Sequence, residues 1–100
     1  GAIEDLTRAI EIMPNEPDLY FNRGSFFYQE GKMEEAERDY ARILDFSPDH
    51  AKACYHRAMA LSKLNRHKEA AAHFVRYLKL EPGNPQSSYL LEYIERHGKK

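Results

Sequence analysis

The sequence is poor in cysteine, with only Cys54 among its 100 residues. A single thiol cannot form a disulfide within the chain, so the sequence excludes a disulfide-stabilised scaffold. Structural disulfides belong mainly to secreted proteins, whereas lone thiols are ordinary in reducing compartments. We therefore expect an intracellular protein, in the cytoplasm rather than the nucleus.

Long apolar runs are also missing from the sequence. No stretch approaches the ~18 consecutive apolar residues that cross a bilayer, and residues 1–5 lack the basic start and apolar stretch of a signal peptide. We therefore predict no membrane partner. Because the chain begins within a helical pattern, we expect it to be a segment of a longer protein. Its 42% of hydrophobic residues, with five Gly and five Pro, indicate a folded domain rather than a disordered one.

An overall excess of charge of one sign is absent. Lys and Arg number 15 and Asp and Glu 16, which gives a net charge of −1. This balance excludes a generally basic domain that binds nucleic acid by neutralising phosphates, so no nucleic-acid partner is predicted. The charges are nevertheless divided along the chain. Residues 1–50 carry 5 basic and 12 acidic side chains (net −7), and residues 51–100 carry 10 and 4 (net +6).

Catalytic and metal-binding signatures are missing as well. The sequence holds no glycine-rich phosphate loop, no Cys-x-x-Cys and no His-Glu-x-x-His spacing. A nucleophilic or metal site assembled from Cys54, His56 and His73 has no such spacing to support it. We interpret Cys54 as a buried structural thiol, and His50, His67 and His73 as solvated or capping residues. The sequence thus predicts no enzyme, no cofactor and no bound metal.

What the sequence does contain is an internal repeat. Prolines stand at positions 14, 48 and 82, and both spacings are 34 residues. Residues 17–48 and 51–82 align without gaps and share six identities, and Gly24 and Ala58 are both small. The identical pairs are Arg23/Arg57, Glu35/Glu69, Ala36/Ala70, Arg42/Arg76, Leu44/Leu78 and Pro48/Pro82.

Each repeated unit has the pattern of two helices. From Pro17 onward, apolar and small residues recur at three- and four-residue steps, as on one face of a helix, and proline suits the first helical turn. Gly31 and Asn65 stand where a helix ends in a left-handed residue. Pro48 and Pro82 stop the helices before them, because an interior proline costs about 3 kcal/mol. We predict helices at residues 2–12, 17–29, 33–45, 51–63, 67–79 and 86–96.

This pattern resembles the tetratricopeptide repeat over essentially the whole chain. That family's unit is a 34-residue helix–turn–helix with a large, a small and an aromatic residue on its first helix. An alanine, an aromatic residue and an alanine or similar residue follow on its second helix, and a proline closes the unit. The matching residues are Tyr20, Gly24, Phe27, Ala36, Tyr40, Ile43 and Pro48 in one unit, and Cys54, Ala58, Leu61, Ala70, Phe74, Tyr77 and Pro82 in the next. The resemblance implies an all-α, right-handed solenoid of antiparallel helix pairs.

In this register the chain is a single repeat domain. Residues 1–16 form the second half of a repeat, 17–50 and 51–84 form full repeats, and 85–100 form a capping helix and tail. A solenoid unit contacts only its neighbours, so the last unit needs a covering element. We expect Leu90, Leu91 and Ile94 to cover that unit and residues 98–100 to be a frayed tail.

The first helix of each pair is expected to line a concave groove. Aromatic side chains there supply contact area, and Asn22 can pair with a ligand's backbone amide. We predict a non-catalytic protein–protein interaction module that binds a peptide segment of a partner. Gln86, Tyr89 and Tyr93 of the last helix extend the wall of this groove. The candidate peptide-binding residues are Phe21, Asn22, Ser25, Tyr28, Lys52, Tyr55, His56 and Met59.

Two alternatives remain open at this point. The repeats could be a structural spacer within a longer array, with no ligand of their own. The wall is also similar to the subfamily that clamps the carboxylate of acidic C-terminal chaperone peptides with Lys and Asn from a first repeat, Asn from a second, and Lys plus Arg from a third. Asn22 and Lys52 match two of these five roles, His56 stands where Arg is expected, and the first-repeat pair would precede Gly1. The resemblance therefore implies a partial clamp for an acidic tail.

The helix at residues 2–12 carries two apolar stripes. We expect Ile3 and Ile10, with part of Leu6, to pack on the following unit. The other stripe is expected to face the place of a preceding helix, and such apolar surface is rarely left open. We therefore predict that the excised fragment self-associates through helix 2–12, by a symmetric or a head-to-tail contact. The second stripe consists of Ala2, Leu6, Ala9 and Met13.

Overall fold

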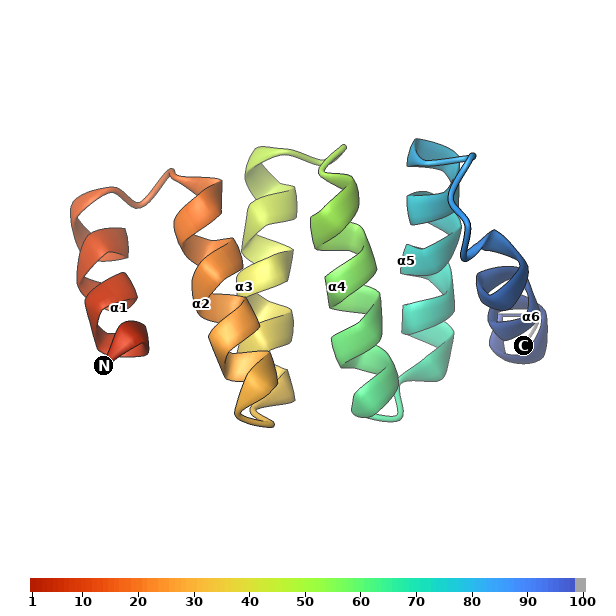
Figure 1. Cartoon of the computed structure of the whole chain (residues 1–100), viewed down its shortest axis with the longest axis horizontal. Coiled ribbons are helices and arrows are strands. Elements are labelled where there is room, and N and C mark those ends of the chain that lie inside the picture. Colours follow the sequence, from red (N-terminus) through yellow and green to blue (C-terminus); the bar gives the residue numbers. More distant parts are fainter. Residues whose placement is uncertain (99–100) are drawn as a thin grey trace.

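A computed structural model describes residues 1–98 as six helices that follow one another in a single row (Figure 1). Residues 99 and 100, which belong to the predicted tail, lie outside the described residues. No strand occurs within residues 1–98, and none of the helices there is both long and apolar enough to cross a bilayer. The predicted helix ends are confirmed to within one residue. The helices are α1 (Ala2–Ile12), α2 (Pro17–Gln29), α3 (Met33–Phe46), α4 (Ala51–Lys63), α5 (His67–Leu80) and α6 (Ser87–His97).

The helix ends follow from the residues predicted to set them. Pro17 occupies the first turn of α2. Gly31 and Asn65 have φ angles of 81° and 63°, in the left-handed region, and they turn the chain from α2 to α3 and from α4 to α5. Helices α3 and α5 end at Phe46 and Leu80, two residues before their prolines. The two tight turns make α2/α3 and α4/α5 antiparallel pairs, as Figure 1 shows.

The pairs stack through a core that runs along the row. One buried cluster joins the α2/α3 pair to its neighbours, and a second joins the α4/α5 pair to α6. Gly24 and Ala58 allow the two helices of each pair to approach closely, and Ala58 is fully buried. The first cluster comprises Ile10, Tyr20, Ala36, Tyr40, Ile43 and Ala53, and the second comprises Ala58, Leu61, Ala70, Phe74 and Leu90. The chain is thus an all-α solenoid of helix pairs.

Two arginines at equivalent repeat positions connect the helices by ion pairs. Arg23 donates from Nε and Nη2 to the Asp39 carboxylate at 2.9 and 2.7 Å, which joins α2 to α3. Its Nη1 donates to Thr7 of α1 at 3.2 Å. Arg57 instead donates to Glu37 of the preceding unit at 2.7 Å, and so joins α4 to α3. Arg23 therefore links the two helices of its own pair and contacts the preceding helix, whereas Arg57 links two successive pairs.

The predicted burial of Cys54 is confirmed. Its side chain is fully buried within α4. Burial is the main reason that the pKa of its thiol is raised above the usual value, because an apolar site disfavours the thiolate. Cys54 therefore acts as a packing residue of the repeat.

Helix α6 covers the last pair with a different face from the predicted one. Leu90 is fully buried and Ile94 packs beside it, but Leu91 is 57% exposed. Positions 90, 93, 94 and 97 share one face of a helix, whereas position 91 is rotated by about 100°. Tyr93 therefore takes the covering role, with its ring 5.2 Å from that of Phe74.

Two of the histidines are also more enclosed than predicted. His50 caps α4 as expected, since its Nδ1 accepts a hydrogen bond from the Ala53 amide. His67 is half-buried, hydrogen-bonds the Tyr93 hydroxyl at 2.6 Å and stacks on His97, with ring centroids 4.4 Å apart. His73 is half-buried as well. The prediction of solvated or capping residues was wrong for these two because α5 is covered on both sides by its neighbours.

Helix α1 packs on α2 through Ile10, which is buried, while Ile3 and Leu6 are half-buried. Its other side is open. Met13 is 49% exposed, and Ile12, which the predicted stripe did not include, is 78% exposed. An apolar edge therefore remains at this end of the row.

Candidate functional site

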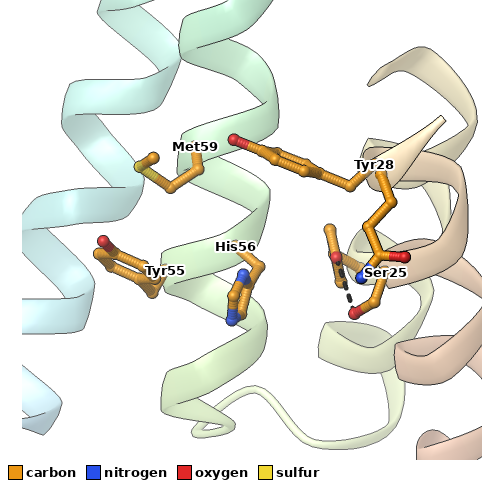
Figure 2. Close-up of a pocket in the computed structure, with 7 residues that line it drawn as sticks. Ser25, Tyr28, Tyr55, His56 and Met59 are labelled. Carbon is orange, nitrogen blue, oxygen red and sulfur yellow. Dashed lines mark hydrogen bonds between the residues drawn. The ribbon is translucent and has the colours of Figure 1, made fainter. Parts of the chain in front are cut away.

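A cleft of about 310 Å³ lies between α2 and α4, the first helices of the two pairs (Figure 2). Residues three and four apart on a helix share a face, so Ser25, Tyr28 and Gln29 of α2 all point to α4. The opposite wall is built from α4 in the same way. The lining residues are Ser25, Tyr28, Gln29, Tyr40, Tyr55, His56 and Met59.

Five of the eight candidate residues from the sequence come together in this cleft, and three do not. Phe21 lies beside the cleft and packs its ring 5.6 Å from Tyr40 and 5.2 Å from His56. Asn22 and Lys52 are exposed and do not line the cleft. Phe21 therefore supports the wall, while Asn22 and Lys52 are exposed polar groups on the same two helices.

The floor of the cleft is Tyr40, which the sequence predicts only as a packing residue of the repeat. Tyr40 of α3 is 1% exposed, and its hydroxyl lies 3.2 Å from the Ser25 hydroxyl. Burial is the main reason that the pKa of Tyr40 is raised. The sequence does contain a signal for this role. Phe74 fills the equivalent position of the next unit, so packing alone needs no hydroxyl at position 40. The floor thus offers two hydroxyl groups under mainly apolar walls.

The walls are aromatic and thioether surface. Tyr28 reaches across toward Met59 in Figure 2. The pKa of the Tyr28 phenol is raised, mainly by burial and to a smaller extent by the nearby Tyr55. Tyr55 is held from behind, with its ring 5.0 Å from Tyr77 and 6.0 Å from Phe74. These supports fix the shape of the cleft before any ligand arrives.

His56 stands between the two walls. Its ring centroid lies 5.2 Å from Phe21, 5.6 Å from Tyr40 and 5.4 Å from Tyr55. Burial, and after it the charge of Lys52, lowers the pKa of His56, so the imidazole is neutral near pH 7. A neutral imidazole has one donor and one acceptor nitrogen. Within residues 1–98 neither nitrogen has a hydrogen-bond partner, and neither is buried.

The last helix does not extend this cleft as predicted. Tyr93 is directed into the core and Gln86 precedes the start of α6. Tyr89 is 67% exposed but lies beside Glu92 and Arg96 at the far end of the row, in a separate small depression. The described residues also contain no group of three or more His, Cys, Asp and Glu side chains placed to hold a metal ion.

Two family models, both described as tetratricopeptide repeat, match residues 1–51 and residues 27–92. The chain belongs to the tetratricopeptide repeat family.

The chain is similar to parts of much longer curated proteins. It is 33% identical over 92 residues to the STIP1 homolog of Dictyostelium discoideum, covering 92% of this chain and 16% of that protein. It is 41% identical over 71 residues to the TPR repeat-containing thioredoxin TDX of Arabidopsis thaliana, covering 71% of this chain and 19% of that protein. The chain thus spans less than a fifth of the length of either relative.

Solved structures match almost the whole chain. The first TPR domain of Spaghetti (RPAP3), bound to the HSP90 peptide SRMEEVD, superposes with a TM-score of 0.86 at 29% identity, over 94% of this chain and 75% of that one. The second TPR domain of human RPAP3, in complex with the HSP70 peptide SGPTIEEVD, gives 0.82 at 32% identity, over 98% and 79%. Family and neighbours together support a protein–protein interaction module.

Proposed function

We propose that this tetratricopeptide repeat domain is a non-catalytic module that binds an extended peptide in the groove along α2 and α4. The observation that carries the proposal is the cleft between these helices. Its walls of Tyr28, Tyr55 and Met59 provide apolar area for one ligand side chain, and its hydroxyl floor and imidazole edge provide polar partners. Sites of this kind, mostly apolar with a few placed polar groups, are typical of ligand recognition.

The charges around α4 favour an acidic ligand. Residues 50–68 contain no Asp or Glu, and Lys52 precedes His56 by one helical turn. A carboxylate close to Lys52 would therefore lie within one turn of the apolar part of the cleft. We infer a ligand in which an apolar residue stands next to acidic residues, with Asn22 as a partner for the ligand's backbone.

The peptides bound by the solved neighbours support this chemistry. SRMEEVD and SGPTIEEVD both place an apolar residue directly before two glutamates and end in a carboxylate. This chain keeps Asn22 and Lys52 at matching positions of the clamp, but His56 replaces the expected Arg. An imidazole cannot form the two parallel hydrogen bonds that a guanidinium forms with a carboxylate. We therefore propose a partial clamp that relies more on the apolar cleft than on binding of the ligand's carboxylate.

A binding experiment tests this proposal. Labelled SRMEEVD and a counterpart with Gln and Asn in place of its acidic residues are titrated with the chain, and fluorescence anisotropy is followed. We expect the acidic peptide to bind more tightly, with an affinity that falls as salt rises. Lys52→Glu should weaken binding by about 1–2 kcal/mol, as for a charge-assisted hydrogen bond, whereas Lys68→Glu on α5 should not.

The experiment also separates the two alternatives. If wild type and Lys52→Glu bound the acidic peptide equally well, the hypothesis of an acidic ligand would be refuted. If neither peptide bound, and a library of other peptides gave no selected motif, the spacer role would be favoured instead. A spacer has no ligand, so the spacer role does not depend on the cleft between α2 and α4.

A further inference from the structure

The imidazole of His56 is held by neighbouring rings, while its nitrogens have no protein partner among the described residues and remain open to solvent. Rings of α2, α3 and α4 enclose it, namely Phe21, Tyr40 and Tyr55, while its edge contributes to the lining of the cleft. No hydrogen bond reaches its nitrogens from the part of the chain that the structure describes. A histidine that lines a ligand site, with neither nitrogen buried, is suited to proton-coupled binding.

We propose that His56 takes up a proton when a carboxylate enters the cleft, so that this domain binds acidic peptides more tightly as the pH falls. The inference rests on the proposed peptide-binding function and concerns the regulation of that same site. It assigns to His56 a role that a permanently charged arginine could not have.

The surroundings of His56 explain why the proton arrives only with the ligand. Lys52 of α4 is the charged side chain that acts on it, and this charge repels a second positive charge. The other titratable groups near it are tyrosines: Tyr28 of α2, which lines the same cleft, and Tyr40 of α3 and Tyr55 of α4, both in ring contact. His50, before α4, contacts the far side of Phe21 and uses its Nδ1 as a helix cap. None of these groups is acidic, so the counter-ion must come from the ligand.

The direction of the pH dependence follows from linkage. In the free domain the pKa of His56 lies below its usual value of 6.5, because burial and Lys52 both disfavour the charged form. A carboxylate within hydrogen-bond distance favours the charged form and raises this pKa. Affinity should therefore increase as pH falls through the pKa of the complex, and level off below the pKa of the free domain. Each unit of difference between the two corresponds to about tenfold in affinity.

The test measures affinity for SRMEEVD at about pH 7.5 and about pH 5.5, where the carboxylates of the peptide are ionised at both values. We expect wild type to bind several-fold more tightly at the lower pH. His56→Asn should lose this gain, and His56→Arg should bind with an affinity that does not change between the two values. His73→Asn is the matched control, since His73 is also half-buried but lines no part of the cleft, and it should keep the gain. Circular dichroism at both pH values shows that each variant is folded.

A second readout separates this inference from the binding proposal. NMR titration of the His56 ring protons, with and without peptide, reports its pKa directly, and we expect the value to rise on binding. Binding with no gain at low pH, or a gain that survives in His56→Asn, would overturn the proton coupling and leave peptide binding intact. Absence of binding at both pH values would overturn the binding proposal, and the proton coupling with it.

Discussion

Gly24 lies against the ring of Tyr40, so closely that a Cβ atom at position 24 would stand 3.1 Å from Tyr40 Cε1 and 3.1 Å from Asp39 Cβ. This approach brings α2 onto α3. It also places the next residue, Ser25, within hydrogen-bond distance of the Tyr40 hydroxyl at the floor of the cleft. The small residue of the repeat therefore determines the site as well as the packing of the pair.

Gly24→Leu should lower the free energy of unfolding by about 1–3 kcal/mol, because the added side chain overpacks the α2/α3 contact. Gly83→Ala is the control, since a Cβ there meets nothing within 4 Å, and its effect should stay within about 0.5 kcal/mol. Urea denaturation measures both. Equal effects of the two substitutions would contradict the close approach of the helices.

Leu90 and Leu91 are neighbours in sequence with opposite surroundings, since Leu90 is fully buried and Leu91 is 57% exposed. Leu90→Ala should destabilise the domain by about 2–4 kcal/mol through loss of apolar contacts and a residual cavity. Leu91→Ala should change stability by less than about 0.5 kcal/mol. The pair of thermal or urea unfolding curves checks which face of α6 covers the core. A comparable loss for both substitutions would instead favour the predicted face, which included both Leu90 and Leu91.

Acidification should destabilise the domain through His73. Burial, and then the charge of Arg57, lowers the pKa of this histidine in the folded state. The unfolded chain therefore binds more protons, and the stabilising contribution is complete above pH ~6.5 and is lost as pH falls through the folded-state pKa. His73→Asn should reduce the slope of unfolding free energy against pH, measured by urea titrations from about pH 7.5 to 5. An unchanged slope would show that His73 contributes nothing to it.

The apolar edge of α1 predicts self-association of the isolated chain. Ile12 and Met13 are exposed there, and apolar patches of this kind mark contact sites. Sedimentation over a wide concentration range should show dimers or larger species, and Met13→Glu should shift the chain to monomer. A head-to-tail contact should also weaken in salt, whereas a symmetric apolar contact should not. Strictly monomeric wild type at high concentration would refute the expectation.

The sequence predicts the architecture well because the constraints are local and repeated. Helix ends depend on single residues whose backbone needs are explicit, as Gly31, Asn65 and Pro17 illustrate. Repetition then supplies the packing partners, since what Gly24 does in one pair Ala58 does in the next. Confirmation of the helix bounds to within one residue follows from these two properties.

The features that the sequence did not predict depend on how α6 is rotated about its axis and on the hydroxyl group of one tyrosine. Helix α6 follows no repeat pattern, so its apolar residues alone could not distinguish a face with Leu91 from a face with Tyr93. The role of Tyr40 in the cleft depends on its hydroxyl meeting Ser25, which a pattern of large and small residues does not encode. Likewise, Phe21 supports the wall instead of lining it because its ring packs on His56.

The most direct test of peptide binding between α2 and α4 is NMR mapping on the uniformly labelled chain. SRMEEVD is added stepwise and the backbone amide shifts are followed. We predict that the largest saturable changes occur around Ser25, Tyr28, Tyr55, His56 and Met59, and that Lys52→Glu needs about tenfold more peptide to reach them. Saturable changes confined to α1 or α6, or no changes at all, would contradict it.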